Sequence, residues 1–288
     1  MIAKPKGPSP TAHTVAYLRA QHQVVEKGSI FHDPLAAPII GVSPEVLASR
    51  AQKFQQNAPL RQFIAARSRF AEDSIAKAVD RGVRQVVVLG AGLDTFGLRN
   101  PYRDKGLRVF EVDRLAAQRW KRRSIAQANL PVPDALTFVA VDFEKQSFLQ
   151  RLASSGFDVK KPAFFVWLGV VQYLSRDAIT GTLAAIARIP DAEIVFDYGE
   201  PASSFPPERR TRYEMVIKIV ELWGEPWVSF FTPSQMERGL TTLGFREIED
   251  LGAAEIEARY PGAGQLGALR LVRARAPQAL LNVDSSAG

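Results

Sequence analysis

The sequence predicts an α/β fold: a Rossmann-like sheet of seven strands with helices on both faces. Short, β-branched apolar runs alternate with helical segments from residue 83 to about 198, which is the pattern of a parallel sheet. The first run ends at Gly90 and Gly92, the place where doubly wound sheets bind nucleotides. Two more strand patterns lie near the C-terminus, so we expect the last strand to insert antiparallel.

Composition is that of a soluble globular protein, with 46% hydrophobic and 23% charged residues among 288. No apolar stretch approaches the ~20 residues of a membrane helix, and the N-terminus lacks the apolar region of a secretory signal. The absence of cysteine excludes disulfides, thiolate zinc sites and cysteine nucleophiles. His13, His22 and His32 are scattered. We therefore expect a cytoplasmic chain without metal or membrane contact.

The net charge of +7 has three interpretations: a solvated surface, a site for an anionic small molecule, or nucleic-acid binding. The basic residues are spread along the chain, and the densest patch, Lys121–Arg123, is only three residues long. This distribution favours a solvated surface, and we expect no nucleic-acid partner.

The N-terminal third predicts a helical extension. Residues 1–10 hold three prolines and two lysines and are expected to form a flexible tail. The extension covers residues 11–82, with a loop and one short turn over 28–44. It closes with a long helix over about 60–81, which has Pro59 just inside its start and ends at Gly82.

Arg67 lies in the middle of the apolar stripe of that helix, whereas Arg69 falls on the opposite side. The stripe consists of Leu60, Phe63, Ile64, Ala71, Ile75 and Ala78. An inward-facing arginine is costly unless it is paired or reaches a ligand. Two interpretations remain open: an ion pair with a distant aspartate, or a clamp for an anionic group.

The sheet domain is expected over residues 83–276, followed by a tail over 277–288. Its seven strand patterns lie at 84–89, 107–113, 136–143, 163–169, 193–198, 244–251 and 268–273. The alternation stops between the fifth and the sixth pattern, where residues 199–235 are rich in proline, arginine and aromatic residues. This segment predicts a lid insertion after strand five.

The glycine-rich turn favours an adenosine ligand without phosphates. Threonine, Thr95, stands in the third glycine position of a dinucleotide fingerprint, and no Walker phosphate loop follows. Acidic side chains end the second and third strand patterns, at Glu111 and Asp113 and at Asp142. Such carboxylates accept hydrogen bonds from a ribose. These features point to S-adenosylmethionine, and an NAD enzyme is the weakest rival.

Five segments together closely resemble the leucine carboxyl methyltransferase family, nearest to its bacterial small-molecule branch. They are Arg67–Phe70, Leu89–Thr95, Phe110–Asp113, Val141–Phe143 and Trp167–Leu174. The resemblance covers about residues 11–275. It implies a methyltransferase domain with the class I fold, an N-terminal helical extension and a lid. It also implies an enzyme that transfers methyl from S-adenosyl-L-methionine to oxygen.

The resemblance further implies which residues hold the methionine part of the cofactor. Arg67, the first arginine of its block, would bind the methionine carboxylate. Gly90 and Gly92 would line the methionine portion with their backbone. Asp94 is the acid of the glycine block, and its alternative role is to cap the short helix that follows.

The adenosine part is assigned to residues at the ends of strands two and three. By the resemblance, Asp113 would bind the ribose hydroxyls, with Glu111 as the alternative. Asp142 would accept a hydrogen bond from the adenine amino group. Phe143 would pack on the adenine ring, unless it only packs in the core.

Leu168 departs from the family's pattern, because many members carry a glutamate at this cofactor-binding position. The missing carboxylate puts the role of that glutamate in doubt. It also weakens an assignment to a protein C-terminal leucine as the methyl acceptor. A protein that binds S-adenosylmethionine without catalysis remains an alternative.

Tyr173 and Tyr198 are the candidate catalytic residues, because both follow strand ends, although either could simply pack. No histidine lies near the strand ends, which favours an acceptor that needs no base, such as a carboxylate of a small molecule. A phenol acceptor and a nucleic-acid methyltransferase are the alternatives. An apolar lid over the acceptor, or core beneath that lid, is expected from Trp223, Trp227, Phe230 and Phe231.

Overall fold

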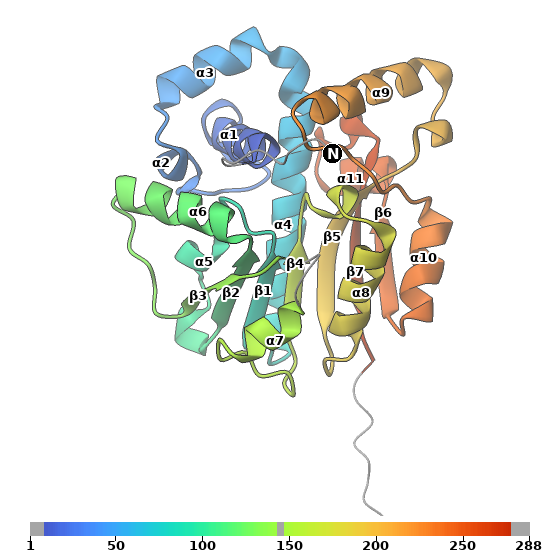
Figure 1. The fold of residues 1–288 in the computed structure, drawn as a ribbon. Helices are drawn as coiled ribbons and strands as arrows, with labels where there is room; N and C mark the ends of the chain where they lie inside the picture. Colours follow the sequence, from blue (N-terminus) through green and yellow to red (C-terminus); the bar gives the residue numbers. More distant parts are fainter. Residues whose placement is uncertain (1–8, 143–146, 278–288) are drawn as a thin grey trace, which may run out of the picture.

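The computed structural model describes residues 9–142 and 147–277. Its centre is one seven-stranded sheet with the strand order β3-β2-β1-β4-β5-β7-β6 (Figure 1). The strands are β1 Gln85–Leu89, β2 Arg108–Asp113, β3 Leu136–Ala140, β4 Phe164–Trp167, β5 Glu193–Gly199, β6 Arg246–Leu251 and β7 Leu269–Arg275. The first five pair in parallel, and β7 runs antiparallel to both β5 and β6. The predicted sheet and its antiparallel last strand are confirmed.

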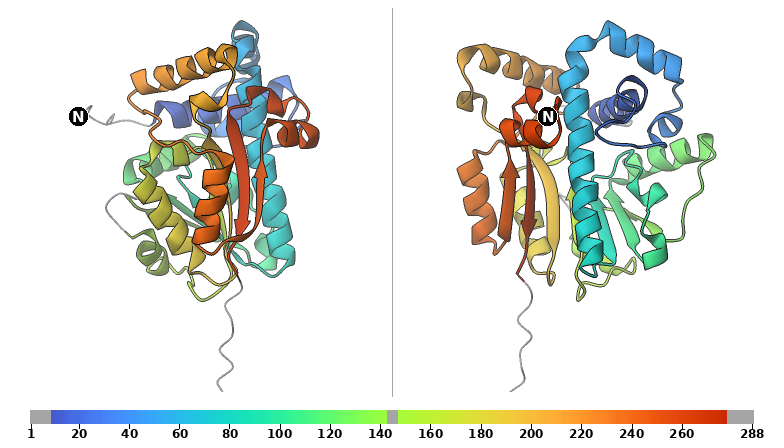
Figure 2. Two further views of the ribbon diagram at one scale, coloured as in Figure 1. Left: turned by 90° about the vertical axis from the view of Figure 1, so that its right-hand side faces the viewer. Right: turned by 180° about the vertical axis from the view of Figure 1, so that it is seen from behind.

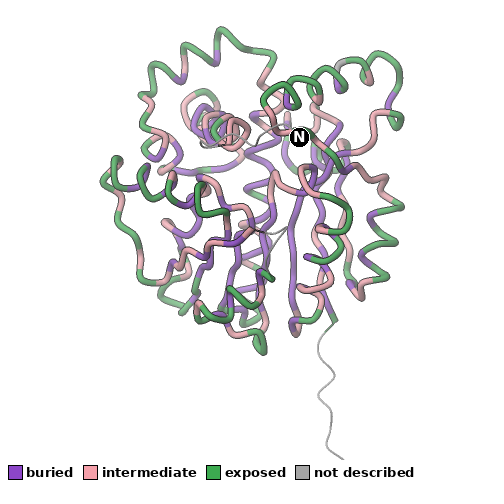
Figure 3. The backbone as a smooth tube through the Cα atoms, viewed as in Figure 1, coloured by how far each residue is buried: buried purple, intermediate pink, exposed green. Residues whose placement is uncertain are grey.

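The central strands are buried on both faces, which explains why their sequences do not alternate between apolar and polar residues. Val86 and Val88 of β1 pack in the core on one face, against α4 (Ala58–Asp80). Val87 and Leu89 face the opposite core, which includes side chains of α8 (Arg176–Ala187) and α10 (Pro233–Thr242). Figure 2 shows α4 alone along the rear of the sheet's centre, and Figure 3 shows the buried strands between exposed helices.

Further helices complete the two layers. They are α5 Phe96–Arg99, α6 Leu115–Gln127, α7 Phe148–Ala153 and α11 Ala253–Arg259. Together with α4, α8 and α10 they leave the carboxyl ends of the parallel strands free to meet the N-terminal extension (Figure 1).

The N-terminal extension forms α1 (Pro10–Val25), α2 (Ala36–Ile40) and α3 (Pro44–Lys53) before the long helix α4. Ser9 caps α1 by accepting a hydrogen bond from the backbone N–H of Ala12. Asp33, fully buried after α1, accepts a hydrogen bond from Thr95 and pairs with Arg19. These bonds hold the extension against the glycine-rich turn, at the carboxyl ends of the strands.

The connection after β5 contains α9 (Pro207–Leu222), which lies above the carboxyl end of the sheet on the side opposite α3 (Figures 1 and 2). Within the two described ranges, no helix combines the length and the apolar character that crossing a membrane would require.

Candidate functional site

A cavity of about 1620 Å³ lies at the carboxyl ends of β1, β2 and β4, between the N-terminal extension and α9. Its lining comes from the glycine-rich turn, from α1 and α4, and from the segment around α9. A pocket for one drug-sized ligand has ~300–1,000 Å³. The cavity therefore has room for two molecules side by side.

Gly90 and Gly92 form the floor of the cavity, and both have positive φ angles, +66° and +47°. A Cβ atom on Gly90 would lie 2.5 Å from Cγ2 of Val170, which no side chain tolerates. A Cβ on Gly92 would meet nothing closer than 3.8 Å. The turn thus needs glycine at both positions, and it exposes backbone to a ligand in the cavity.

Asp113 is the carboxylate that β2 delivers to the cavity. Its two oxygens accept hydrogen bonds from the backbone N–H groups of Gly92, at 2.8 Å, and Arg114, at 2.7 Å. Burial raises the pKa of Asp113, while these two N–H groups oppose the rise. The bonds fix the carboxylate beside the glycine-rich turn.

Glu111, the alternative to Asp113, does not line the cavity. It is fully buried beneath α6, where it forms an ion pair with Lys121. Burial raises the pKa of Glu111 to about 7, although Lys121 opposes the rise. Of the two acidic residues at the end of β2, the structure brings only Asp113 to the ligand space.

Asp94 lies one residue before Thr95, the N-cap of α5, whose side chain forms no cap hydrogen bond at that helix. Its Oδ1 accepts a hydrogen bond from the backbone N–H of Phe96, at 2.7 Å, at the start of α5. Its Oδ2 lies 3.6 Å from Nη1 of Arg19. Asp94 also lines the cavity, and its predicted contact with a ligand stays a prediction.

Asp142 lies half-buried in the cavity lining, beyond the end of β3. Phe143, predicted to pack on the adenine ring, lies outside the described residues.

The structure shows the ion pair that was one interpretation of the inward position of Arg67, and the other, a clamp for an anionic group, stays a prediction. It is only 5% exposed, and its Nη1 donates a hydrogen bond of 2.9 Å to Oδ2 of the fully buried Asp197 on β5. The same guanidinium lines the cavity and lies against Gly169, where a Cβ atom would come within 2.9 Å of Nη2. Arg69 faces outward, half-exposed, and pairs with Asp73.

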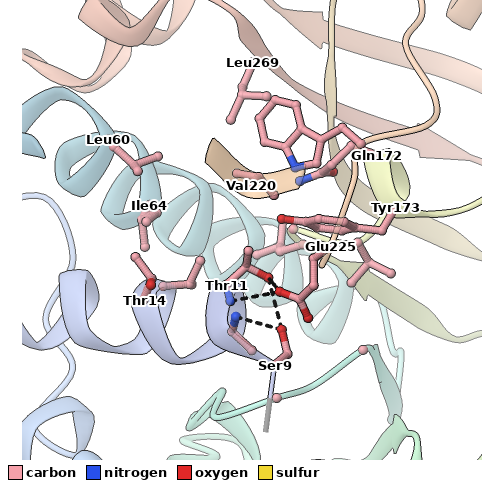
Figure 4. A pocket seen from close by; sticks show the side chains of 18 of the residues that line it. Ser9, Thr11, Thr14, Leu60, Ile64, Gln172, Tyr173, Val220, Glu225 and Leu269 are labelled. Atoms are coloured by element: carbon pink, nitrogen blue, oxygen red, sulfur yellow. Dashed lines mark hydrogen bonds between the residues drawn. The ribbon is translucent and has the colours of Figure 1, made fainter. Parts of the chain in front are cut away.

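Tyr173 lies in the cavity wall, with its ring edge-on to that of Trp227 at 6.4 Å between centroids. Burial raises the pKa of Tyr173, so its hydroxyl keeps its proton at neutral pH. Figure 4 shows Tyr173 and Gln172 on one side of the pocket, across from Leu60 and Ile64 of α4.

Tyr198 is not at the cavity, which corrects the prediction that placed it at the substrate site. It is fully buried, and its hydroxyl donates a hydrogen bond of 2.7 Å to Asp250 on β6. Successive side chains of a strand point to opposite faces. Because Asp197 faces Arg67 of α4, Tyr198 faces the core on the other side of the sheet.

Of the four aromatic residues assigned to the lid, Trp223 and Trp227 line the cavity. Phe230 packs on Trp227, and Phe231 packs on the buried Tyr198. Two of the four residues therefore line the cavity, Phe230 packs behind one of them, and Phe231 belongs to the core around Tyr198.

Sequence reasoning missed a link that closes the cavity between α1 and the end of α9. The carboxylate of Glu225 accepts hydrogen bonds from the backbone N–H of Thr11, at 3.0 Å, and from its hydroxyl, at 2.6 Å (Figure 4). No local pattern marks a pair 214 residues apart. Asp197 was also missed, although an acid near the end of a strand pattern is a recognisable signal.

Comparison with known proteins identifies the family to which this chain belongs. A model of the family described as leucine carboxyl methyltransferase matches residues 12–187. A protein of Bacillus subtilis (strain 168), which carries the name of the S-adenosyl-L-methionine-dependent methyltransferase YktD, is 31% identical over 242 residues. That alignment covers 83% of this chain and 78% of the relative.

This chain belongs to the leucine carboxyl methyltransferase family. A second relative in this group, from Streptomyces coelicolor, is 32% identical over 189 residues, or 64% of this chain and 65% of its own length. The enzyme is an S-adenosylmethionine-dependent methyltransferase, as its relatives are named.

Two solved structures share the fold of this methyltransferase. One, described as a methyltransferase from Thermobifida fusca YX, gives a TM-score of 0.61 at 14% identity and covers 94% of this chain and 96% of its own. The other, a DUF574-family protein from Streptomyces avermitilis, gives a TM-score of 0.59 at 15% identity, with 90% and 97% coverage.

The cavity of the methyltransferase fits S-adenosylmethionine by the chemistry of its lining. Gly90 and Gly92 leave a backbone surface that a Cβ at Gly90 would block. Asp113 and Asp142 offer carboxylates for the ribose and adenine groups, and Arg67 offers a cation for the methionine carboxylate. When bound, the cofactor supplies a methyl group already activated on a sulfonium.

Leu168 occupies the position at which many members of the methyltransferase family have glutamate. Its half-buried side chain lines the cavity and packs with the core on the α4 side. An apolar group therefore faces the cofactor region here, next to Gly169 and Arg67.

The two tyrosines are expected to respond differently to removal of the hydroxyl. Tyr173→Phe should lower kcat/KM about two- to tenfold, the value of one hydrogen bond of ~0.5–1.5 kcal/mol. Tyr198→Phe should leave kcat/KM nearly unchanged but lower the free energy of unfolding by ~1 kcal/mol, because Asp250 loses a donor. Steady-state kinetics and urea unfolding measure these effects. A larger kinetic loss for Tyr198→Phe than for Tyr173→Phe would contradict the placement of the two side chains.

Proposed function

We propose that this methyltransferase transfers the methyl group to an acidic oxygen, foremost a carboxylate, of a small apolar molecule. The observation that carries the proposal is the second half of the cavity. Its walls are apolar at Leu60, Ile64, Val220 and Leu269, while Tyr173 and Gln172 add polar groups to the same lining (Figure 4).

A carboxylate acceptor suits these residues because methyl transfer to it needs no general base at neutral pH. Among the residues that the structure describes, no histidine lines the cavity. The raised pKa of Tyr173 makes its hydroxyl a donor rather than a base. The side chain of Gln172 is 3% exposed and its Oε1 has no hydrogen-bond partner, so a buried polar group with unused hydrogen-bonding capacity lies in the cavity wall beside Tyr173.

The chain's own contribution to the reaction is alignment and exclusion of water. In the transfer, the acceptor oxygen forms a bond to the methyl carbon while the carbon–sulfur bond breaks, and the sulfur keeps the electron pair. Holding both reactants in line removes much of the entropic barrier. Arg67 and Asp113 orient the cofactor end, and the apolar walls near Tyr173 orient the acceptor and keep water out.

A phenol acceptor is the second candidate, and Glu225 is the observation that favours it. This carboxylate lines the same part of the cavity as Tyr173. One of its oxygens accepts both hydrogen bonds from Thr11, which leaves the other oxygen able to take a proton from a phenol.

A screen of aromatic and aliphatic carboxylic acids and of phenols, with S-adenosylmethionine labelled on its methyl group, tests the proposal. Because a carboxylate is ionised throughout the neutral range, the rate with acids should be nearly flat from about pH 6 to 8. Methylation of phenols alone, with a rate that rises through neutrality and is lost in Glu225→Gln, would replace the carboxylate by the phenol.

A further inference from the structure

The helix α9 carries an unusual exposed apolar stripe. Five large apolar side chains, four on α9 and one directly after it, are between 38% and 77% exposed. They are Met215, Val216, Ile219, Leu222 and Trp223. The spacing i, i+1, i+4, i+7, i+8 puts all five on one side of a helix. Contiguous exposed apolar surface of this kind usually marks a binding site.

The stripe is not part of the packing that holds α9 in place. A different side of the helix is anchored by Tyr213 and Val220, each 7% exposed. Tyr213 packs with Phe205 and Ala268 in a small cluster of its own. A third side carries the exposed charges of Glu214 and Lys218. The helix therefore has one side for the core, one for water, and an apolar stripe left without a partner in the described chain.

The stripe continues into the cavity that holds the cofactor residues. Met215, Val216, Ile219 and Trp223 line the same cavity as Gly90 and Asp113. The lining of the same cavity also includes Gln56 and Asn57, directly before α4, and Pro59 and Leu60 in its first turn. The stripe is thus the outer wall of an apolar groove that begins at Tyr173 and opens to the surface between α9 and α4.

The exposure of the stripe favours a long occupant. The cofactor and the acceptor share the volume of about 1620 Å³, so it is the uncovered apolar side chains of α9, and not the volume, that indicate the length of the acceptor. A compact acceptor beside Tyr173 would leave the groove along α9 empty and its apolar side chains in water.

We infer that the methyl acceptor is an elongated amphiphile, with an acidic oxygen at one end and an apolar chain that lies along the stripe of α9. The inference rests on the proposed function and names its substrate class. The acidic end would meet Tyr173 and Gln172, and the chain would cover Ile219, Met215 and Trp223 on its way out.

Straight-chain carboxylic acids of six, ten and fourteen carbons are suitable probes. Their dissociation constants are measured by isothermal titration, below the concentrations at which they form micelles, with S-adenosylhomocysteine saturating. Because each buried methylene stabilises by ~0.8 kcal/mol, affinity should rise up to about fourfold per carbon while the chain stays in the groove. An affinity independent of chain length overturns the inference.

The variant Met215→Gln/Ile219→Gln tests the stripe itself. It should weaken binding of the fourteen-carbon acid about tenfold and leave the six-carbon acid within about twofold. Lys218→Gln is the matched control, because it places the same side chain on the charged side of α9 and should change neither. All three positions are exposed, so the fold does not depend on them. Equal binding of the long acid by the double variant and the original chain overturns the inference.

Three further outcomes separate this inference from its rivals and from the proposed function. The chain could sediment with phosphatidylcholine vesicles while the double variant does not, and the affinity for the acids could be independent of their length. These two results together would assign the stripe to a membrane instead. A chain that binds S-adenosylhomocysteine and methylates short acids, but shows no length dependence, contradicts this inference alone. Failure to bind S-adenosylhomocysteine would overturn the proposed function, and this inference with it.

Discussion

Replacing Arg67 with methionine is expected to lower the free energy of unfolding by about 3–5 kcal/mol. The change removes the cation that is paired with Asp197, and Asp197 is fully buried on β5. Its remaining hydrogen bond, from the backbone N–H of Gly169, does not neutralise the charge. A buried carboxylate without its cation is costly because the protein interior replaces water poorly. Urea unfolding measures the loss.

Two comparisons separate the ion pair from other effects at Arg67. Arg69→Met, one helical face away, should change stability by less than ~1 kcal/mol, because that arginine is half-exposed and paired only with Asp73. The double variant Arg67→Met/Asp197→Asn should recover part of the loss, because no unpaired charge remains and the amide oxygen can still accept from Gly169. A double variant less stable than Arg67→Met alone would contradict this account.

The same arginine links stability to cofactor binding. Arg67→Met should weaken the binding of S-adenosylhomocysteine by ~1.5–3 kcal/mol, as expected for the loss of a charged hydrogen bond. Arg69→Met should leave that affinity unchanged. Isothermal titration without urea, at a temperature at which both variants are folded, measures this affinity. Equal losses of affinity for the two variants would show that Arg67 acts only as one positive charge among others and not through a direct contact with the cofactor.

Glu111 is expected to make the protein less stable as the pH rises from 5 to 8. Its pKa is raised by burial from 4.5 to about 7, against the effect of Lys121 and with smaller contributions from Asp94 and Asp113. Between these two pKa values the folded state binds the proton more tightly than the unfolded state. Stability is therefore greatest below the unfolded pKa and is lost as the pH rises through the folded pKa, by about 2–3 kcal/mol over this window.

The variant Glu111→Gln isolates this effect, because glutamine has the same shape and does not titrate. The difference in the free energy of unfolding between the original chain and Glu111→Gln should fall by about 2–3 kcal/mol from pH 5 to pH 8. Urea unfolding at each pH measures this difference. Glu214→Gln, on the exposed side of α9, is the control for the same substitution outside the buried pair. A pH-independent difference for Glu111→Gln would mean that the buried pair with Lys121 stays ionised throughout.

Much of the fold follows from short stretches of sequence. The run Gln85–Leu89 is apolar at every central position because both faces of the sheet are covered, and this pattern alone predicts a central parallel strand. Pro59 and Gly82 bracket the long helix because of backbone properties that each residue has on its own. The inward position of Arg67 also follows from local geometry, because helical periodicity fixes which residues share a face.

The choice between neighbouring candidates required the tertiary structure. Glu111 and Asp113 point to the same face of β2, and only the packing of α6 decides that Lys121 covers the first while the second reaches the cavity. Tyr198 follows a strand pattern as Tyr173 does, but its strand turns it toward Asp250. The alternation of side chains along a strand predicts that Asp197 and Tyr198 point to opposite faces of the sheet. It does not predict which of the two points toward Arg67.

Features that depend on neighbours along the chain could be predicted from residue patterns: the seven strands, the glycine-rich turn, the inward arginine and the resemblance to the methyltransferase family. Contacts between distant segments could be found only in the folded chain. Asp197 lies 130 residues from Arg67, and Glu225 lies 214 residues from Thr11. The physical reason is that periodicity and backbone preference act over a few residues, whereas an ion pair or a cavity wall forms wherever packing brings side chains together.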